Sequence, residues 1–265
     1  MTTSDQLIVP ERFCGPRLSG NGGWTSGALA TLVDHDCPED RSESWPAIAV
    51  TLHAPPPLDV RLLVRVDRGA TVLEQDGARV ATALVVDRDL RIVAPVPADE
   101  ARAAEASYPG HHDSPFPHCF VCGPARAEGD GLRIFPGSVP PDATGRTRVA
   151  ATWTPHPSLR EDFHTYLDAH PRAGVAATWA ALDCPGGWAG GLAERPMVLG
   201  RLTARLDSLP VIGEEHVVVG EHRGEEGRKT FTATTLYDAF GRAVATSEQV
   251  WISVDPARFE GHPTD

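Results

Sequence analysis

Asp183 is the residue of this chain whose surroundings most favour chemistry. Ten uncharged residues, AGVAATWAAL at 173–182, precede it, and Cys184 and then Pro185-Gly186-Gly187 follow it. Alanine and leucine favour a helix over 173–183, and proline and glycine predict its end. A helix that is apolar on all faces belongs inside a protein, where an unpaired carboxylate is costly. Asp183 therefore needs a partner or a catalytic purpose, unless it is a partly exposed residue that accepts local hydrogen bonds.

A glycine-rich stretch in the first part of the chain could supply hydrogen-bond donors. Gly20-Asn21-Gly22-Gly23 leads into Trp24 and an uncharged segment that ends at Asp34, and we expect a helix to start near Gly23. Glycines leave the N–H groups at a helix start unobstructed, and such groups bind an anion or a developing oxyanion. The alternative is a tight turn in which glycine supplies a positive φ.

Two of the five cysteines form a pair that resembles half of a zinc site, His118-Cys119-x-x-Cys122. Structural zinc takes four ligands, usually from a second close pair, and the chain has no second CxxC. His111 and His112 could contribute, but they fall in a predicted linker. We therefore expect no metal site here, only buried thiols at the start of a strand. An odd number of cysteines at low density predicts free thiols and a reducing compartment.

Cys184 is an alternative nucleophile. A nucleophilic cysteine requires a nearby base, which His164 or His170 could provide by sequence alone. Both histidines belong to the segment 156–171, which we expect to be a surface loop, although it leads into the key helix and could line its pocket. The chain contains no Gly-x-Ser-x-Gly elbow, no P-loop and no Gly-x-Gly-x-x-Gly motif, which argues against α/β-hydrolases and nucleotide-binding enzymes.

Length and charge exclude several classes of partner. The chain has 265 residues, which suits two domains, and a net charge of −12. An acidic chain repels phosphate backbones and anionic lipid surfaces, so we expect neither nucleic acid nor membrane as a partner. No apolar run approaches the ~20 residues that span a bilayer, and the first residues do not resemble a signal peptide. We expect a cytoplasmic protein.

Periodicity predicts two similar parts separated by a proline-rich linker. We expect a first domain at 1–97, a linker with a short helix at 98–117, a second domain at 118–256 and a tail at 257–265. In the first domain a lead-in or edge strand (1–12) and the helix precede strands at 47–53, 60–66, 70–74, 78–86 and within 87–96. In the second, strands are expected at 131–135, 147–153, 197–206, 215–222, 229–237 and 242–253.

The two parts share short motifs as well as a plan. Gly-x-x-Val-Ala-Thr occurs at 77–82 and 241–246, late in each run of strands, and Cys-Gly-Pro occurs at 14–16 and 122–124. Each part places an uncharged, small-residue helix before antiparallel strands. The common order indicates a duplicated domain rather than a solenoid.

Three segments carry a resemblance to a known family: GNGGWTSGALA (20–30), HCFVCGPARAEGDGLRIF (118–135) and WAALDCPGG (179–187). They resemble actinobacterial members of the thioesterase-like, PaaI-related hot-dog superfamily in a double hot-dog arrangement, over nearly the whole chain. The resemblance implies an α+β fold in which each half is a long central helix wrapped by a curved antiparallel sheet.

In acyl-CoA thioesterases of this superfamily, a His-Gly-Gly or similar stretch opens the central helix, and a backbone N–H there polarises the thioester carbonyl. A carboxylate about two turns further on activates water or attacks the thioester. Asn21-Gly22-Gly23 resembles the first feature, and Asp183 stands at the carboxylate position of the second helix. The matching positions read Ala30 in the first helix and Gly174-Val175 in the second, so each half keeps one part.

The resemblance thus implies one composite site between the halves, with Asp183, Asn21 and Gly23 as the catalytic residues. The expected reaction is hydrolysis of an acyl-CoA or related thioester without a cofactor, in a homodimer. We expect the substrate to contact four residues, although the two tryptophans could instead fill the core: Gly22, Trp24, Trp179 and His170. The alternatives are a non-catalytic hot-dog protein that binds an acyl or aromatic ligand, and a dehydratase or isomerase on the same fold.

Overall fold

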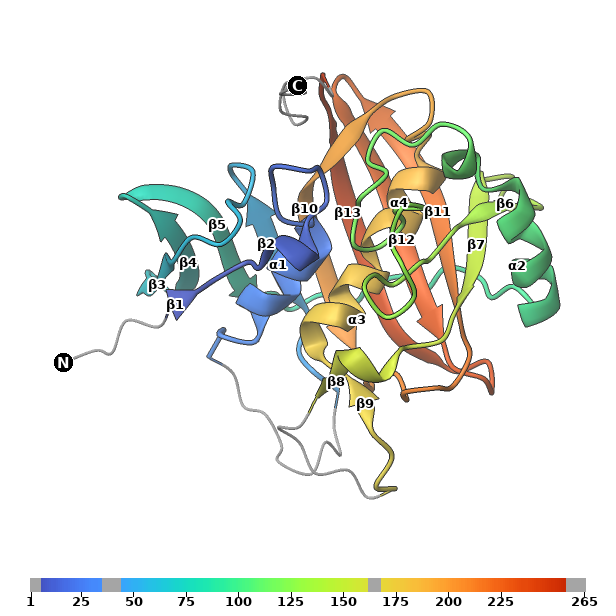
Figure 1. The fold of residues 1–265 in the computed structure, drawn as a ribbon, viewed down its shortest axis with the longest axis horizontal. Coiled ribbons are helices and arrows are strands. Elements are labelled where there is room, and N and C mark those ends of the chain that lie inside the picture. Colours follow the sequence, from blue (N-terminus) through green and yellow to red (C-terminus); the bar gives the residue numbers. More distant parts are fainter. Residues whose placement is uncertain (1–5, 35–43, 162–167, 256–265) are drawn as a thin grey trace.

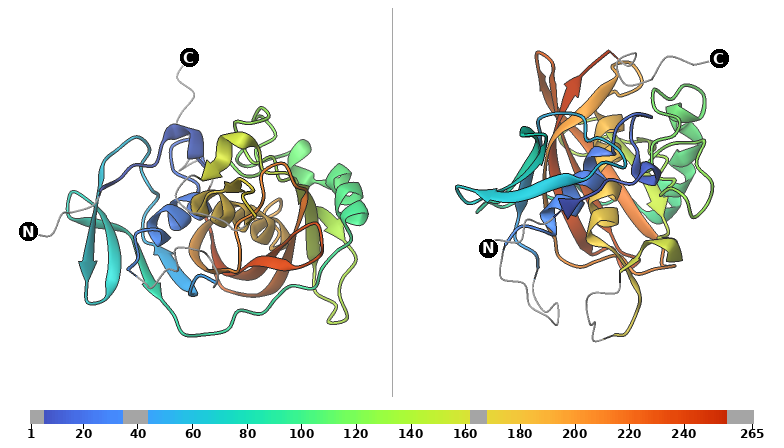
Figure 2. Two further views of the ribbon diagram at one scale, coloured as in Figure 1. Left: turned by 90° about the horizontal axis from the view of Figure 1, so that it is seen from below. Right: turned by 60° about the vertical axis from the view of Figure 1, so that its left-hand side comes forward.

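A single antiparallel sheet of eleven strands dominates the structure, a computed structural model that describes residues 6–34, 44–161 and 168–255. The sheet curves around the helices (Figures 1 and 2). Its strands lie in this spatial order: β1 (Gln6–Leu7), β3 (Leu62–Asp67), β4 (Ala70–Gln75), β5 (Ala78–Val85), β2 (Ile48–Leu52), β10 (Met197–Leu206), β13 (Ala243–Ser253), β12 (Lys229–Tyr237), β11 (His216–Glu226), β7 (Arg148–Trp153) and β6 (Gly137–Val139).

The order of the strands repeats from one half of the sheet to the other. Starting from the central pair β2 and β10, the strands continue as β5-β4-β3-β1 on one side and as β13-β12-β11-β7 on the other. The halves join where Ile48–Thr51 pairs with Ala204–Arg201. The Gly-x-x-Val-Ala-Thr motifs lie at the start of the corresponding strands β5 and β13. This agreement supports the duplication, while the exact domain limits stay predictions.

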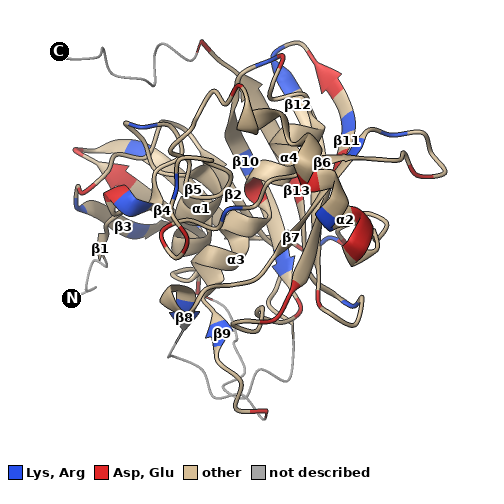
Figure 3. Ribbon diagram, turned by 45° about the vertical axis from the view of Figure 1, so that its right-hand side comes forward, with Lys and Arg blue, Asp and Glu red and all other residues tan. Residues whose placement is uncertain are grey.

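The helices that carry the predicted site pack against one face of this sheet. They are α1 (Gly22–Ala30), α3 (Val175–Ala181) and α4 (Asp183–Ala189). A Cβ on Gly27 would lie 2.6 Å from the Cβ of Trp179, so glycine is what lets α1 approach α3 this closely. Neither α1 nor α3 carries a charged residue, as Figure 3 shows, and the few charges near them belong to other elements.

The prediction that Pro185-Gly186-Gly187 ends the second helix is wrong. The chain turns at Leu182 and continues as α4 through all three residues. Pro185 lies in the first turn of α4, where its missing N–H has no intrahelical role. Gly186 packs against the sheet, because a Cβ there would lie 2.3 Å from Gln249 Oε1. A long central helix in each half is not confirmed, since α1 has nine residues and α3 and α4 have seven each.

Two predicted strands are not formed. Residues 87–96 cross the sheet without pairing, held by Val93 N–H donating to Thr235 Oγ1 over 3.0 Å. Residues 131–135 instead bond to the CxxC segment, where Leu132 N donates to Phe120 O over 2.8 Å. The remaining short elements are α2 (Ala98–Ala104), which confirms the predicted short helix, β8 (Arg160–Glu161), β9 (Arg172–Ala173) and four 3₁₀ turns at Glu11–Phe13, Glu105–Ser107, Pro109–His111 and Pro157–Leu159.

No helix in the described part of the chain is long and apolar enough to cross a membrane. The predicted tail at 257–265, His164 and Cys37 lie outside the described residues.

Candidate active site

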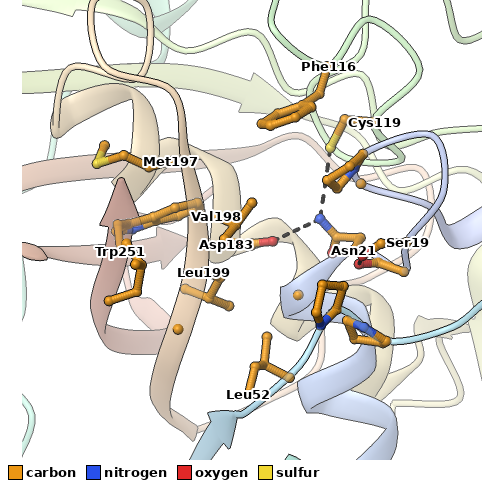
Figure 4. Close-up of a pocket in the computed structure, with 18 of the residues that line it drawn as sticks. Ser19, Asn21, Leu52, Phe116, Cys119, Asp183, Met197, Val198, Leu199 and Trp251 are labelled. Atoms are coloured by element: carbon orange, nitrogen blue, oxygen red, sulfur yellow. Dashed lines mark hydrogen bonds between the residues drawn. The ribbon is translucent and has the colours of Figure 1, made fainter. Parts of the chain in front are cut away.

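Asp183 is the first residue of α4 and is almost fully buried, with 2% of its surface exposed. Its Oδ2 accepts hydrogen bonds from Asn21 Nδ2 at 2.8 Å and from the Gly23 N–H at 2.9 Å (Figure 4). Its Oδ1 has no partner among the described residues. The fold therefore brings Asp183 to two residues that precede it by 162 and 160 positions, and it joins the start of α1 to the start of α4.

Burial raises the pKa of Asp183 to about 7. The hydrogen bond from Gly23 and the one from Asn21 stabilise the charged form and oppose this rise, whereas the nearby Cys119 adds to it. A carboxyl group whose pKa lies near neutrality can both accept and donate a proton at that pH, as general acid–base catalysis requires.

Asn21 uses both ends of its amide, which explains why asparagine suits this position. Its Oδ1 caps α1 by accepting from Trp24 N at 2.8 Å, with the backbone in the extended conformation typical of an N-cap. Its Nδ2 donates to Asp183 and also lies 3.8 Å from Cys119 Sγ. The residue thus links the helix start, the buried carboxylate and the CxxC segment.

Asp183 and Asn21 line a cavity of about 220 Å³. Its walls are mostly apolar, and Figure 4 shows Asp183 and Asn21 among them; the labelled apolar residues are Leu52, Phe116, Met197, Val198, Leu199 and Trp251. Gly22, one of the predicted substrate contacts, also lines the cavity. An apolar cavity with a few polar groups is typical of a site for a small ligand with an acyl or aromatic part.

Three of the predicted substrate contacts are not among the residues that line this cavity. Trp24 stacks on Phe13, with ring centroids 4.1 Å apart, because α1 turns it away from the cavity. Trp179 is buried in the core against Gly27. His170 is exposed and borders a separate hollow beside Arg172.

The oxyanion donors expected at the start of α1 are already occupied. The Gly23 N–H is bound to Asp183 and the Trp24 N–H to Asn21, so neither is free for a substrate oxygen. The Gly22 N–H has no hydrogen-bond partner within the described ranges, and Gly22 lies in the cavity wall. Of these three N–H groups, that of Gly22 is the one without a hydrogen-bond partner in the described ranges.

Cys184 does not have the surroundings of a nucleophile. Its Sγ lies 3.6 Å from that of Cys119, and no histidine side chain of the described ranges bonds to it. Hydrogen bonding with Cys119 and Cys122, together with burial, raises the pKa of Cys184 and disfavours the reactive thiolate.

A buried polar cluster that was not predicted from the sequence holds the turn before Asp183. Gln249 Nε2 donates to the Leu182 carbonyl at 2.6 Å, and its Oε1 accepts from Thr232 Oγ1 at 2.6 Å. These residues come from β12 and β13, far from Asp183 in the sequence. The available signal was the alternation of threonines 230, 232 and 234, which puts polar groups on one face of β12.

Comparisons with known structures identify the architecture. The M. avium subs paratuberculosis tesB protein matches with a TM-score of 0.55 and 13% identity, over 91% of this chain and 89% of that one. The acyl-CoA thioesterase II TesB2 of Mycobacterium marinum matches with a TM-score of 0.56 and 13% identity, over 96% and 94%. An Alicyclobacillus acidocaldarius protein of unknown function with a hot dog fold matches with a TM-score of 0.56 and 15% identity, over 96% and 93%.

These similarities and the repeated strand order show a double hot-dog fold, which confirms the α+β class predicted from the sequence. A search of protein-family models gave no match, and a search of curated proteins gave none. At 13–15% identity the structural similarity concerns the fold alone.

Proposed function

We propose that this protein hydrolyses acyl thioesters, with coenzyme A thioesters as the substrate class and Asp183 as the residue that activates water. One observation carries the proposal: a buried carboxylate lines an apolar cavity, with one oxygen held by Asn21 and Gly23 and the other without a partner among the described residues. The two hydrogen bonds orient the carboxylate, and the second oxygen remains available for a water molecule.

In the proposed reaction, Asp183 takes a proton from water while the water oxygen attacks the thioester carbonyl carbon. The Gly22 N–H would stabilise the negative charge that develops on the carbonyl oxygen. The carbon–sulfur bond then breaks, and the Asp183 carboxyl returns its proton to the departing thiolate. Direct attack by Asp183 on the carbonyl carbon is the alternative role of the same group.

The acyl part would occupy the apolar side of the cavity, between Leu52, Leu199 and Trp251. Named thioesterases among the proteins of similar fold support the same reaction class. Two further expectations, a cytoplasmic location and a homodimer, stay predictions.

Thiol release from a panel of acyl-CoA substrates tests the proposal. A general base contributes roughly 10²–10⁴-fold, so Asp183→Asn should lower kcat/KM by at least about 10²-fold. Asp76→Asn, at the exposed turn between β4 and β5, is the matched control and should leave kcat/KM unchanged. Turnover that survives Asp183→Asn would remove Asp183 from the mechanism.

A binding protein without activity is the second candidate, because the Gly23 and Trp24 N–H groups expected to stabilise an oxyanion are occupied. In that case no thioester in the panel would release thiol, yet an acyl-CoA would still raise the melting temperature of the protein.

A further inference from the structure

Three buried cysteines gather beside the cavity, and the proposed hydrolysis uses none of them. The Sγ atoms of Cys119, Cys122 and Cys184 all lie within 4.8 Å of one another, and those of Cys119 and Cys184 are 3.6 Å apart. None of the three is more than 5% exposed, and all three line the cavity. Because two of them come from a loop and the third from α4, the tertiary structure and not the sequence creates the cluster.

The spacing of these sulfur atoms suits a metal ion. Zinc binds thiolate sulfur at about 2.3 Å, which places two sulfur ligands of a tetrahedral ion about 3.8 Å apart. The 3.6 Å between Cys119 and Cys184 is close to that value. We propose that Cys119, Cys122 and Cys184 form a zinc-binding site whose fourth coordination position opens into the cavity.

The loop that carries the first two ligands is held in place by the surrounding chain. The Phe120 N–H donates to Cys14 O at 2.7 Å, and Tyr108 Oη donates to Cys122 O at 2.8 Å. The Gly123 N–H donates to Cys119 O at 2.9 Å, and a Cβ on Gly123 would lie only 2.5 Å from that oxygen. Glycine therefore permits the tight turn from Cys119 to Gly123, which holds both cysteines without a bound ion.

A donor for the thiolates is also present. Trp188 Nε1 is buried and has no hydrogen-bond partner in the described part of the chain. The Trp188 indole lies within reach of the Cys122 thiol. An N–H beside a ligating sulfur stabilises the thiolate form that a metal requires.

The chemistry of the ligands selects the class of metal. Thiolates favour zinc or monovalent copper over magnesium and calcium, which prefer oxygen. Three protein ligands and one open position are the pattern of zinc sites that bind water or a substrate group, whereas structural sites use four protein ligands. A zinc ion here would share the cavity with Asp183. The proposal departs from the sequence-based expectation of no metal, because Cys184 supplies the ligand that a second CxxC would otherwise provide.

Metal binding by the full-length protein tests this site without reference to activity. The protein is purified under a phosphine reductant, stripped with a chelator and titrated with zinc in competition with a chromogenic chelator. One ion per chain is expected. With cobalt in place of zinc, sulfur-to-cobalt charge-transfer absorption should appear, with an intensity that corresponds to three thiolates.

Variants identify the ligands. Cys119→Ser and Cys184→Ser should each weaken zinc binding by at least about 100-fold, the upper end of the loss when an outer-shell partner is removed. Cys14→Ser is the matched control, because Cys14 is buried nearby but its Sγ bonds to Arg126 and to the His118 carbonyl instead. Its zinc affinity should equal that of the unchanged protein.

Several results would overturn the proposal. They are zinc binding of less than one ion per chain, binding of copper but not zinc, a Cys119–Cys184 disulfide in the reduced preparation, or a Cys184→Ser variant with unchanged affinity. The cobalt spectrum of the unchanged protein remains decisive if a variant fails to fold. Because the readout is metal binding, absence of thioesterase activity would not affect the result.

Discussion

The helix starts of the two halves carry opposite parts of one site. At the start of α1, Asn21 caps the helix with its side chain and directs two donors, its own amide and the Gly23 N–H, at Asp183. At the start of α3, the corresponding position is Gly174, which has no side chain to cap the helix. The carboxylate is present only in the second half: α4 begins with Asp183, whereas the matching residue of α1 is the buried Ala30.

This difference shows how a duplicated fold can keep a single site. Two symmetric sites would bury two carboxylates, each of which needs donors that only polar or glycine-rich helix starts supply. With one part in each half, one carboxylate is buried at this place, and its Oδ2 accepts two hydrogen bonds. The remaining site depends on how closely the two halves approach each other.

The largest effect should follow from Gly23→Ala, which forces the two helices apart. A Cβ on Gly23 would lie 2.5 Å from the Cβ of Asp183 and 3.0 Å from the Cα of Ala180, neither of which can move freely. Overpacking of this kind lowers the free energy of unfolding by about 1–3 kcal/mol. Because the substitution also displaces Asp183, the variant should lose most of its thioesterase activity. Urea unfolding and thiol-release assays measure the two effects.

Ser26→Ala is the control on the same helix. Ser26 is buried and its Oγ has no hydrogen-bond partner in the described part of the chain, so its removal should change stability and turnover little. If Gly23→Ala behaves like Ser26→Ala, the close approach of the halves is not needed for the site.

A smaller effect is expected at Asn21, where two substitutions separate its two roles. Asn21→Ser keeps a helix cap, and Asn21→Ala removes it, so the alanine variant should be less stable by about 1 kcal/mol in urea unfolding. Both variants lose the amide that donates to Asp183, and both should lose about 10–100-fold in kcat/KM, as for a 1.5–3 kcal/mol hydrogen bond to a charged group. Equal stability of the two variants would contradict the capping role of Asn21, and full activity of Asn21→Ser would contradict its role as a donor to Asp183.

The smallest effect on turnover should come from substitutions of Trp24 and Trp179, because neither tryptophan lines the cavity. Trp24→Leu removes the stack on Phe13, which is worth about 0.5–1.5 kcal/mol. Trp179→Leu should destabilise more, since Trp179 is 2% exposed in the core. Neither change should shift KM for an acyl-CoA. A large increase in KM for Trp24→Leu would indicate that Trp24 contacts the substrate after all.

Strand positions were the most predictable part of the fold. The limits of β10 and β12 match their predicted ranges, 197–206 and 229–237, because turn-forming residues flank both ends of each strand. The helices were harder. Pro185 and Gly186 predict the end of a helix by local preference, but contact with β13 outweighs that preference and α4 continues.

The candidate site was predicted in part. Asp183, Asn21 and Gly23 meet as expected, but the sequence does not show which N–H groups remain free, and Gly23 turned out to serve Asp183. The contacts of Cys184 and Gln249 were not predicted, since their partners lie on other elements. Such contacts depend on distances across the fold, which composition and spacing do not contain.

The sequence by itself determined the local features of this protein: an acidic chain, two uncharged helix segments, a capping asparagine beside glycines, and a duplicated order of strands. These follow from the conformational preferences and hydrophobicity of neighbouring residues. Only the tertiary structure decided which side chains meet. Packing of the buried helices against each other and against one face of the sheet places Asp183 against Asn21, raises the pKa of Asp183, and brings three separate thiols to one wall of the cavity.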